Sequence, residues 1–298
     1  EDDQALKPFD LASRLSYALW AGPPDGELLA MAASGKLTEE EAFRGQVKRL
    51  LKDDRSKGFV KGFLDSWLNL RDLGGMPPPR ERARRYYSEN WPASMKGEVW
   101  HFFAHLLEKN VSVVTLLDAD FTFVDKYLAA VYRLPEAKTL RLKDGFRRVK
   151  LDKEDRRGGI LGMAAVLSVS ANGVDTSPVT RGVFVSENIL GVVPPSPPDE
   201  VPPIEPDIRG ATTLRERLEK HRESKTCAEC HHKIDPLGFG LENFDELGRW
   251  RTHYRRSGKP LFVKKAPKRK VDSSGEMPSG EAFEDFRELR DILVSTRS

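Results

Sequence analysis

The chain has 298 residues, of which 39% are hydrophobic and 32% are charged. That composition is typical of a folded globular protein and excludes a wholly disordered chain. The length fits one large domain or two to three smaller units. The formal net charge is only +3, so any binding by charge must be local. The longest apolar run, Ile160 to Val169, is shorter than the ~20 residues of a membrane span.

The first part of the chain predicts a helical domain. Leucines recur at helical spacing between Leu11 and Leu19, and Thr38 with Glu41 forms the pattern of a capping box that opens a helix. A break rich in glycine and proline follows at residues 74–79. A longer helix is then expected over residues 93–109, because its apolar side chains form one stripe.

Glu98, His101 and His105 lie opposite that apolar stripe. The spacing of Glu98 and His101 is that of half a di-iron site in a helix bundle, which requires a second such motif. The sequence contains none. We therefore expect a solvated face, from which either histidine could still reach another domain.

The second part begins with the apolar segment 160–169, which predicts a buried helix. Ser177 as N-cap, Pro178 as first helical residue and Gly191 just past the end frame a further helix. Seven of the 13 residues from position 194 to position 206 are proline, which predicts an extended strap.

The two cysteines of the chain, Cys227 and Cys230, precede His231 in the pattern Cys-x-x-Cys-His. Two thiols on one helical turn can reach the two vinyl groups of a haem, and the next side chain offers an imidazole to its iron. A turn at residues 235–238 and a short helix carrying Leu241 are expected to follow. The motif predicts one covalent haem c, with His231 as the iron ligand.

Three other interpretations of the cysteines remain open. A redox pair would use the same thiols, but the surrounding sequence does not have the strand-then-helix pattern of a thioredoxin-like unit. A zinc site would need two further ligands, and the adjacent His231 and His232 point in different directions. A structural disulfide accounts for the cysteines and leaves the histidine unexplained.

The segments 172–182 and 227–245 resemble the large planctomycete-type cytochrome c proteins, which are built from consecutive domains of unknown function. The resemblance covers nearly the whole chain and implies further parts beyond both of its ends. It also implies an extracytoplasmic location, with the signal segment outside this chain, haem binding and electron transfer. It supplies no catalytic residues.

The predicted fold is mainly α. Residues 1–140 form a helical domain, and residues 141–248 form a cytochrome c-like, haem-binding domain with the proline-rich strap. Residues 249–298 form a basic stretch and a partial C-terminal domain that contributes to the haem pocket.

Two further sets of residues are expected near the haem. Arg181 is a fixed cation suited to a haem propionate, and Asp175 could orient it through a bidentate ion pair, although a capped helix with a surface arginine is an equal alternative. Met277 is the predicted distal iron ligand, because a thioether suits an electron-transfer haem. The competing distal ligands are His253, His101 and His105, and the position could also be vacant.

Residues 249–270 carry ten lysines and arginines and no acid. Such a field would speed the encounter with an acidic redox partner protein, although an exposed, solvated loop has the same composition. Nothing indicates nucleic acid as a partner, and the sequence does not define an oligomeric state.

The favoured function is an extracytoplasmic electron-transfer module with one haem c. One alternative is a periplasmic oxidoreductase or peroxidase-like enzyme with an open iron position. In another, the helical domain is a scaffold that docks the haem against a dehydrogenase.

Overall fold

The computed structural model describes residues 7–152, 154–173, 175–195, 215–216, 218, 225–254 and 269–295, with side chains of the segment 225–254 described from residue 228. The fold is mainly α, as predicted. Of the proline-rich segment, only residues 194 and 195 are described, so the predicted strap lies outside the described residues. The same holds for residues 255–268 of the basic stretch.

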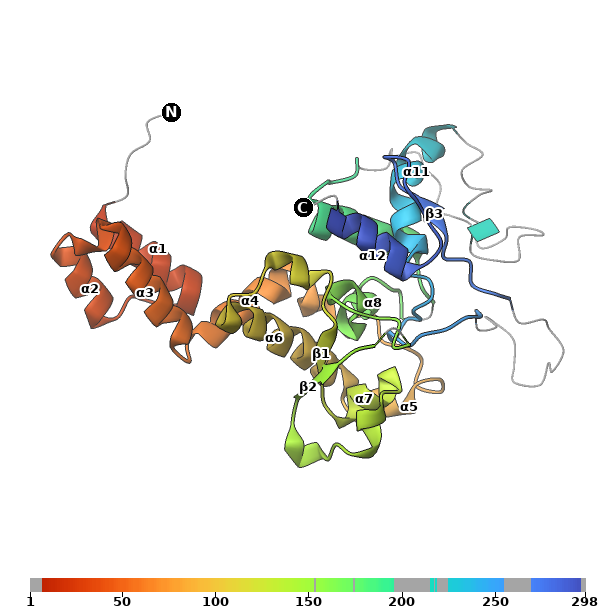
Figure 1. Ribbon diagram of the computed structural model, residues 1–298, viewed down its shortest axis with the longest axis horizontal. Coiled ribbons are helices and arrows are strands. Elements are labelled where there is room, and N and C mark those ends of the chain that lie inside the picture. Colours follow the sequence, from red (N-terminus) through yellow and green to blue (C-terminus); the bar gives the residue numbers. More distant parts are fainter. Residues whose placement is uncertain are drawn as a thin grey trace.

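The chain opens with a small bundle of three helices at one end of the molecule (Figure 1). These are α1 (Pro8–Trp20), α2 (Gly26–Ala33) and α3 (Glu40–Lys52), and they enclose a hydrophobic core of their own. Trp20 closes that core by donating a hydrogen bond from Nε1 to the Leu50 carbonyl at 2.9 Å. The predicted capping box is wrong, because Glu39 is the N-cap of α3 and Thr38 Oγ1 instead bonds the Gly35 carbonyl.

Helix α4 (Ser56–Trp67) leads from this bundle into the main body, where it packs beside the long helix α6 (Trp91–Lys109) (Figure 1). The short helix α5 (Arg84–Ser88) precedes α6, and α7 (Lys126–Tyr132) follows it. Strand β1 (Phe121–Val124) pairs antiparallel with β2 (Arg147–Lys150), with Phe121 opposite Lys150. The expected helix at 93–109 is thus confirmed and begins two residues earlier.

The second half of the chain contributes further helices and a two-stranded sheet. They are α8 (Ala164–Val169), α9 (Pro178–Phe184), α11 (Lys225–Phe239), β3 (Gly275–Glu276), β4 (Ala282–Phe283) and α12 (Phe286–Ser295). Single turns of 3₁₀ helix lie at Lys36–Thr38, Leu70–Asp72, Val113–Leu116, Pro135–Lys138, Leu142–Asp144 and Ile160–Gly162, and a π-helical segment at Val185–Leu190 extends α9. The predicted caps are confirmed: Ser177 accepts a hydrogen bond from the Thr180 N–H, and Gly191 is left-handed.

One prediction in this half is wrong. The sequence predicts a turn at residues 235–238, which combine aspartate, proline and glycine. Helix α11 instead continues through Pro236 to Phe239. The residues after it form turns and an isolated bridge between Phe244 and Trp250, where a short helix was expected.

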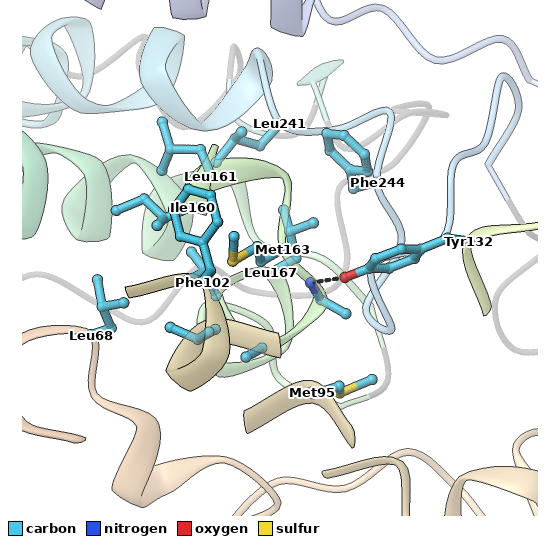
Figure 2. Close-up of a cluster of buried hydrophobic side chains, with 14 of the residues drawn as sticks. Leu68, Met95, Phe102, Tyr132, Ile160, Leu161, Met163, Leu167, Leu241 and Phe244 are labelled. Atoms are coloured by element: carbon cyan, nitrogen blue, oxygen red, sulfur yellow. Dashed lines mark hydrogen bonds between the residues drawn. The ribbon is translucent and has the colours of Figure 1, made fainter. Parts of the chain in front are cut away.

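Among the described residues, the larger hydrophobic core contains side chains from both halves of the chain (Figure 2). Phe102 of α6, Leu167 of α8 and Leu289 of α12 are all fully buried in it. Figure 2 also shows the hydroxyl of Tyr132 accepting a hydrogen bond, which the Ala164 N–H donates at 2.7 Å. Burying these side chains is the principal source of stability for such a layered helical body.

Candidate functional site

Helix α11 carries the predicted attachment motif. Cys227 lies in its first turn, and Cys230 and His231 follow one turn later. Cys230 is a free thiol with a partly exposed side chain, while the side chain of Cys227 lies outside the described part. The predicted anchors therefore share one helix, and the side chains of Cys230 and His231 are partly exposed.

The imidazole of His231 is held by a buried carboxylate. Its Nδ1 lies 2.9 Å from Oδ1 of Asp235, one turn further along the same helix. The side chain of His231 is 14% exposed and that of Asp235 is fully buried. A carboxylate oxygen can only accept, so Nδ1 is the donor in this contact, and in the neutral imidazole the lone pair is then on Nε2.

A close crossing between α9 and α11 fixes this pair in place. A Cβ at Gly182 would lie 2.1 Å from the Ile234 carbonyl oxygen, and a Cβ at Gly238 would lie 1.8 Å from the Pro178 carbonyl oxygen. Neither distance is possible for a real side chain. Glycine at these two positions therefore lets the two backbones touch, which sets the position of α11 on α9.

Arg181 of α9 cross-links the residues that follow α11. Its guanidinium is fully buried and donates hydrogen bonds to the carbonyl groups of Leu241, Phe244, Asp245 and Leu167. Its ion-pair partner is Glu242, at 3.2 Å. Burial lowers the pKa of Arg181 to about 10, which still leaves the side chain charged at neutral pH.

The predicted ion pair between Arg181 and Asp175 is therefore wrong, because Arg181 pairs with Glu242 instead. Asp175 lies in a loop, where its N–H donates to Asn172 Oδ1 at 2.8 Å. The surface position given as the alternative for Arg181 is wrong as well, because the side chain is an internal cross-link. A contact of either residue with a haem stays a prediction.

Glu242 is the hub of this network and was missed from the sequence. Besides Arg181, it accepts hydrogen bonds from Thr176 Oγ1 at 2.8 Å and from Arg251 at 2.9 Å. Thr176 precedes α11 in the sequence, and Arg251 follows it. No local pattern distinguishes Glu242 from an exposed glutamate, so only its burial reveals the role.

The candidates for the distal ligand lie in different places. Met277 directly follows β3, which packs beside α11, and its side chain is 7% exposed within the main core. His253 is exposed, in a bridge with Lys270. His101 and His105 lie against Phe123, with ring centroids 6.0 and 5.5 Å away.

The prediction that Glu98 lies on a solvated face of α6 is wrong. The side chain is buried, 1% exposed, and accepts hydrogen bonds from Thr122 Oγ1 at 2.6 Å and from the Tyr132 hydroxyl. Burial raises its pKa to about 7. Its partners come from β1 and α7, so the helical pattern alone could not reveal them.

Within the described ranges, the His, Cys, Asp and Glu side chains form no group of three or more that could hold a metal ion. A search of the same residues finds no helix long and apolar enough to cross a membrane.

Comparison with known families divides the chain into two matched segments. Residues 6–134 match the model of PSD4, a protein of unknown function (DUF1592). Residues 157–254 match the model of PSCyt3, a protein of unknown function (DUF1588). The chain carries two consecutive domains of these families. No curated protein and no solved structure matches it.

The family matches place the observed features in two domains. Glu98 and Tyr132 belong to the PSD4 domain, and Arg181, α11 and Glu242 belong to the PSCyt3 domain. The hydrogen bond from the Ala164 N–H to Tyr132 therefore joins the two. The domain limits expected at residues 140 and 248 stay predictions, and the pairing of β1 with β2 crosses the first of them.

Proposed function

We propose that the chain is an extracytoplasmic c-type cytochrome module that binds one haem c covalently and transfers electrons. The observation that carries the proposal is that α11 presents the Cys-x-x-Cys-His motif with the Nδ1 of its histidine bonded to Asp235. The location follows from the motif, since attachment of haem to it is extracytoplasmic chemistry. The match to consecutive PSD4 and PSCyt3 domains agrees with the resemblance of the sequence to planctomycete-type cytochromes.

The residues present fit such a group. Cys230 offers a free, partly exposed thiol, and the helix places Cys227 one turn before it. The tautomer of His231 puts the lone pair on Nε2, the nitrogen that faces away from Asp235. Cys227 and Cys230 would hold the porphyrin, and His231 would bind its iron.

A bound haem would supply a one-electron redox centre. The role of the protein chain would be to provide a rigid support for that centre. The glycine crossing holds α11 against α9, and the buried Arg181 ties α9 to the turns that follow α11, so that the backbone does not have to reorganise when charge changes at His231. Fixed surroundings of this kind are what tune a redox centre.

The test is the mass of the denatured protein, made in cells that attach haem c. We expect the wild-type chain to retain one haem mass and the Cys227→Ala/Cys230→Ala variant to lose it. Ser34→Ala, a change on the exposed end of α2, is the control and should keep the haem. A wild-type chain of unmodified mass would contradict the proposal.

We also propose an acidic redox partner, from the cations of residues 249–270 other than Arg249 and Arg251, which pair with Asp245 and Glu242. Attraction between such surfaces weakens as salt screens it, with a Debye length of about 8 Å at physiological ionic strength. Electron-transfer rates should therefore fall as ionic strength rises. Rates that are insensitive to salt would remove the docking role of this stretch.

A further inference from the structure

Asp235 occupies a position that the motif itself does not explain. Haem attachment needs the two cysteines and the histidine, and it makes no demand on the fourth residue after that histidine. Yet Asp235 is fully buried, and its Oδ1 lies 2.9 Å from His231 Nδ1. Residues four apart share one helix face, so the pair is set by the helix itself.

The surroundings of Asp235 hold it on that face. Ile234 beside it touches Gly182 of α9, and Gly238, less than one turn later, touches the Pro178 backbone. Helix α11 also runs through Pro236, although that residue has no N–H to bond the preceding turn. A helix that ended at residue 235 would lose the contact at Gly238, and the His231–Asp235 pair would be held less firmly against α9.

A carboxylate bonded to the outer nitrogen of a ligating histidine has a known physical effect. It fixes the tautomer and the orientation of the ring, and it makes the inner nitrogen a stronger electron donor. A stronger donor favours the oxidised iron over the reduced iron. An imidazole bonded to a neutral acceptor lacks much of this effect, because a charged acceptor makes the stronger hydrogen bond.

We propose that Asp235 is the positioning residue that orients His231 toward a bound haem iron and lowers the reduction potential of that haem. The proposal rests on the proposed haem attachment. It adds that the chain sets its redox properties from the proximal side, through a buried carboxylate on the same helix.

The experiment compares Asp235→Asn with Glu229→Gln in the holoprotein. Both variants remove one acidic group from α11, but Glu229 is exposed, so its loss tests charge without the buried hydrogen bond. At a fixed applied potential, Asp235→Asn should raise the ratio of reduced to oxidised haem about tenfold, which is about 59 mV for a one-electron couple. Glu229→Gln should shift the ratio much less, and Asp235→Glu should stay closer to the wild type than Asp235→Asn.

A measurement on the wild-type protein covers the case in which Asp235→Asn does not fold. In the reduced form, which is diamagnetic once the distal position is filled by Met277 or, if it is open, by added carbon monoxide, nuclear magnetic resonance should detect the His231 Nδ1 proton as protected from solvent exchange. Rapid exchange of that proton would overturn the proposal. Equal shifts of potential in Asp235→Asn and Glu229→Gln would overturn it as well.

The two proposals fail in different ways. Loss of haem from the wild-type chain would show in its mass and would overturn both. Retained haem with no effect of Asp235 on potential or proton exchange would overturn only the role of Asp235.

Discussion

Gly238 of α11 touches the carbonyl oxygen of Pro178, the first residue of α9. The contact joins the helix that carries the motif to the helix framed by Ser177 and Gly191. Adding one methyl group at Gly238 therefore tests whether this close helix contact stabilises the protein.

Gly238→Ala should destabilise the protein. Its Cβ would lie 1.8 Å from the Pro178 oxygen, so the backbones must separate, at a typical cost of about 1–3 kcal/mol. Gly62→Ala is the matched control, since a Cβ there meets nothing within 4 Å in the middle of α4. It should leave stability unchanged or raise it by up to about 1 kcal/mol. Thermal melting measures both, and equal melting temperatures would show that the crossing is not close.

Arg181→Ala should be among the most damaging single changes. It removes one of the two arginines that pair with Glu242 and the donor to four backbone carbonyl groups. Breaking a buried ion pair from one side costs about 3–5 kcal/mol. Arg287, whose side chain is 55% exposed, provides the control, and its change to alanine should cost less than about 0.5 kcal/mol. Urea unfolding that finds the two variants alike would refute the internal cross-link.

Because of Glu98, we expect the free energy of unfolding to depend on pH. Its pKa rises on folding from 4.5 to about 7, so the folded state binds the proton more tightly than the unfolded state. The stabilisation is complete below pH 4.5 and is lost as the pH rises through 7, by about 3 kcal/mol in total. Glu98→Gln should flatten this slope.

The measurement for Glu98 is denaturant unfolding at pH values from 4 to 8. Glu108→Gln is the control, because that residue is on the same helix with a side chain 70% exposed. Its slope should match that of the wild type. A wild-type slope that Glu98→Gln does not change would mean that another group titrates in this range.

Met277→Leu tests the predicted distal ligand. The swap keeps the volume of the buried side chain and should cost less than about 1.5 kcal/mol in stability. If the thioether binds the iron, the oxidised protein has a weak charge-transfer band at the red end of its spectrum, and the variant loses it. We expect this loss, because Met277 directly follows the strand that packs beside α11. An unchanged spectrum would assign the distal position to a histidine or leave it open.

Local chemistry explains which parts of the fold could be predicted. The caps at Ser177 and Gly191 depend on a few neighbouring residues, and their positions were foreseen. The helix at 93–109 follows from one apolar stripe. Pro236 misled the prediction, because a proline that ends most helices is tolerated here in a helix packed on α9. Tertiary contact outweighed the local preference.

In the candidate site, too, the features set by neighbouring residues could be predicted, and those set by distant residues could not. The roles predicted for Cys227, Cys230 and His231 follow from adjacent residues. The partner of Arg181 was misassigned because Glu242 lies in another segment, some sixty positions away. Glu98 was expected in solvent because its partners, Thr122 and Tyr132, belong to elements that the helical pattern does not include. The contact of Asp235 with His231 could not be predicted, because the sequence placed Asp235 in a turn and the structure places it in α11.

The shared main core also bears on how such a chain can be rearranged in evolution. Side chains of the PSD4 domain, such as Phe102, are buried against the same cluster as Leu167 of the PSCyt3 domain. Recombination between residues 134 and 157 would join one domain to an unrelated neighbour and leave an apolar face without its complement. The two domains are therefore expected to be inherited together, while the first three helices, with a core of their own, are free to diverge.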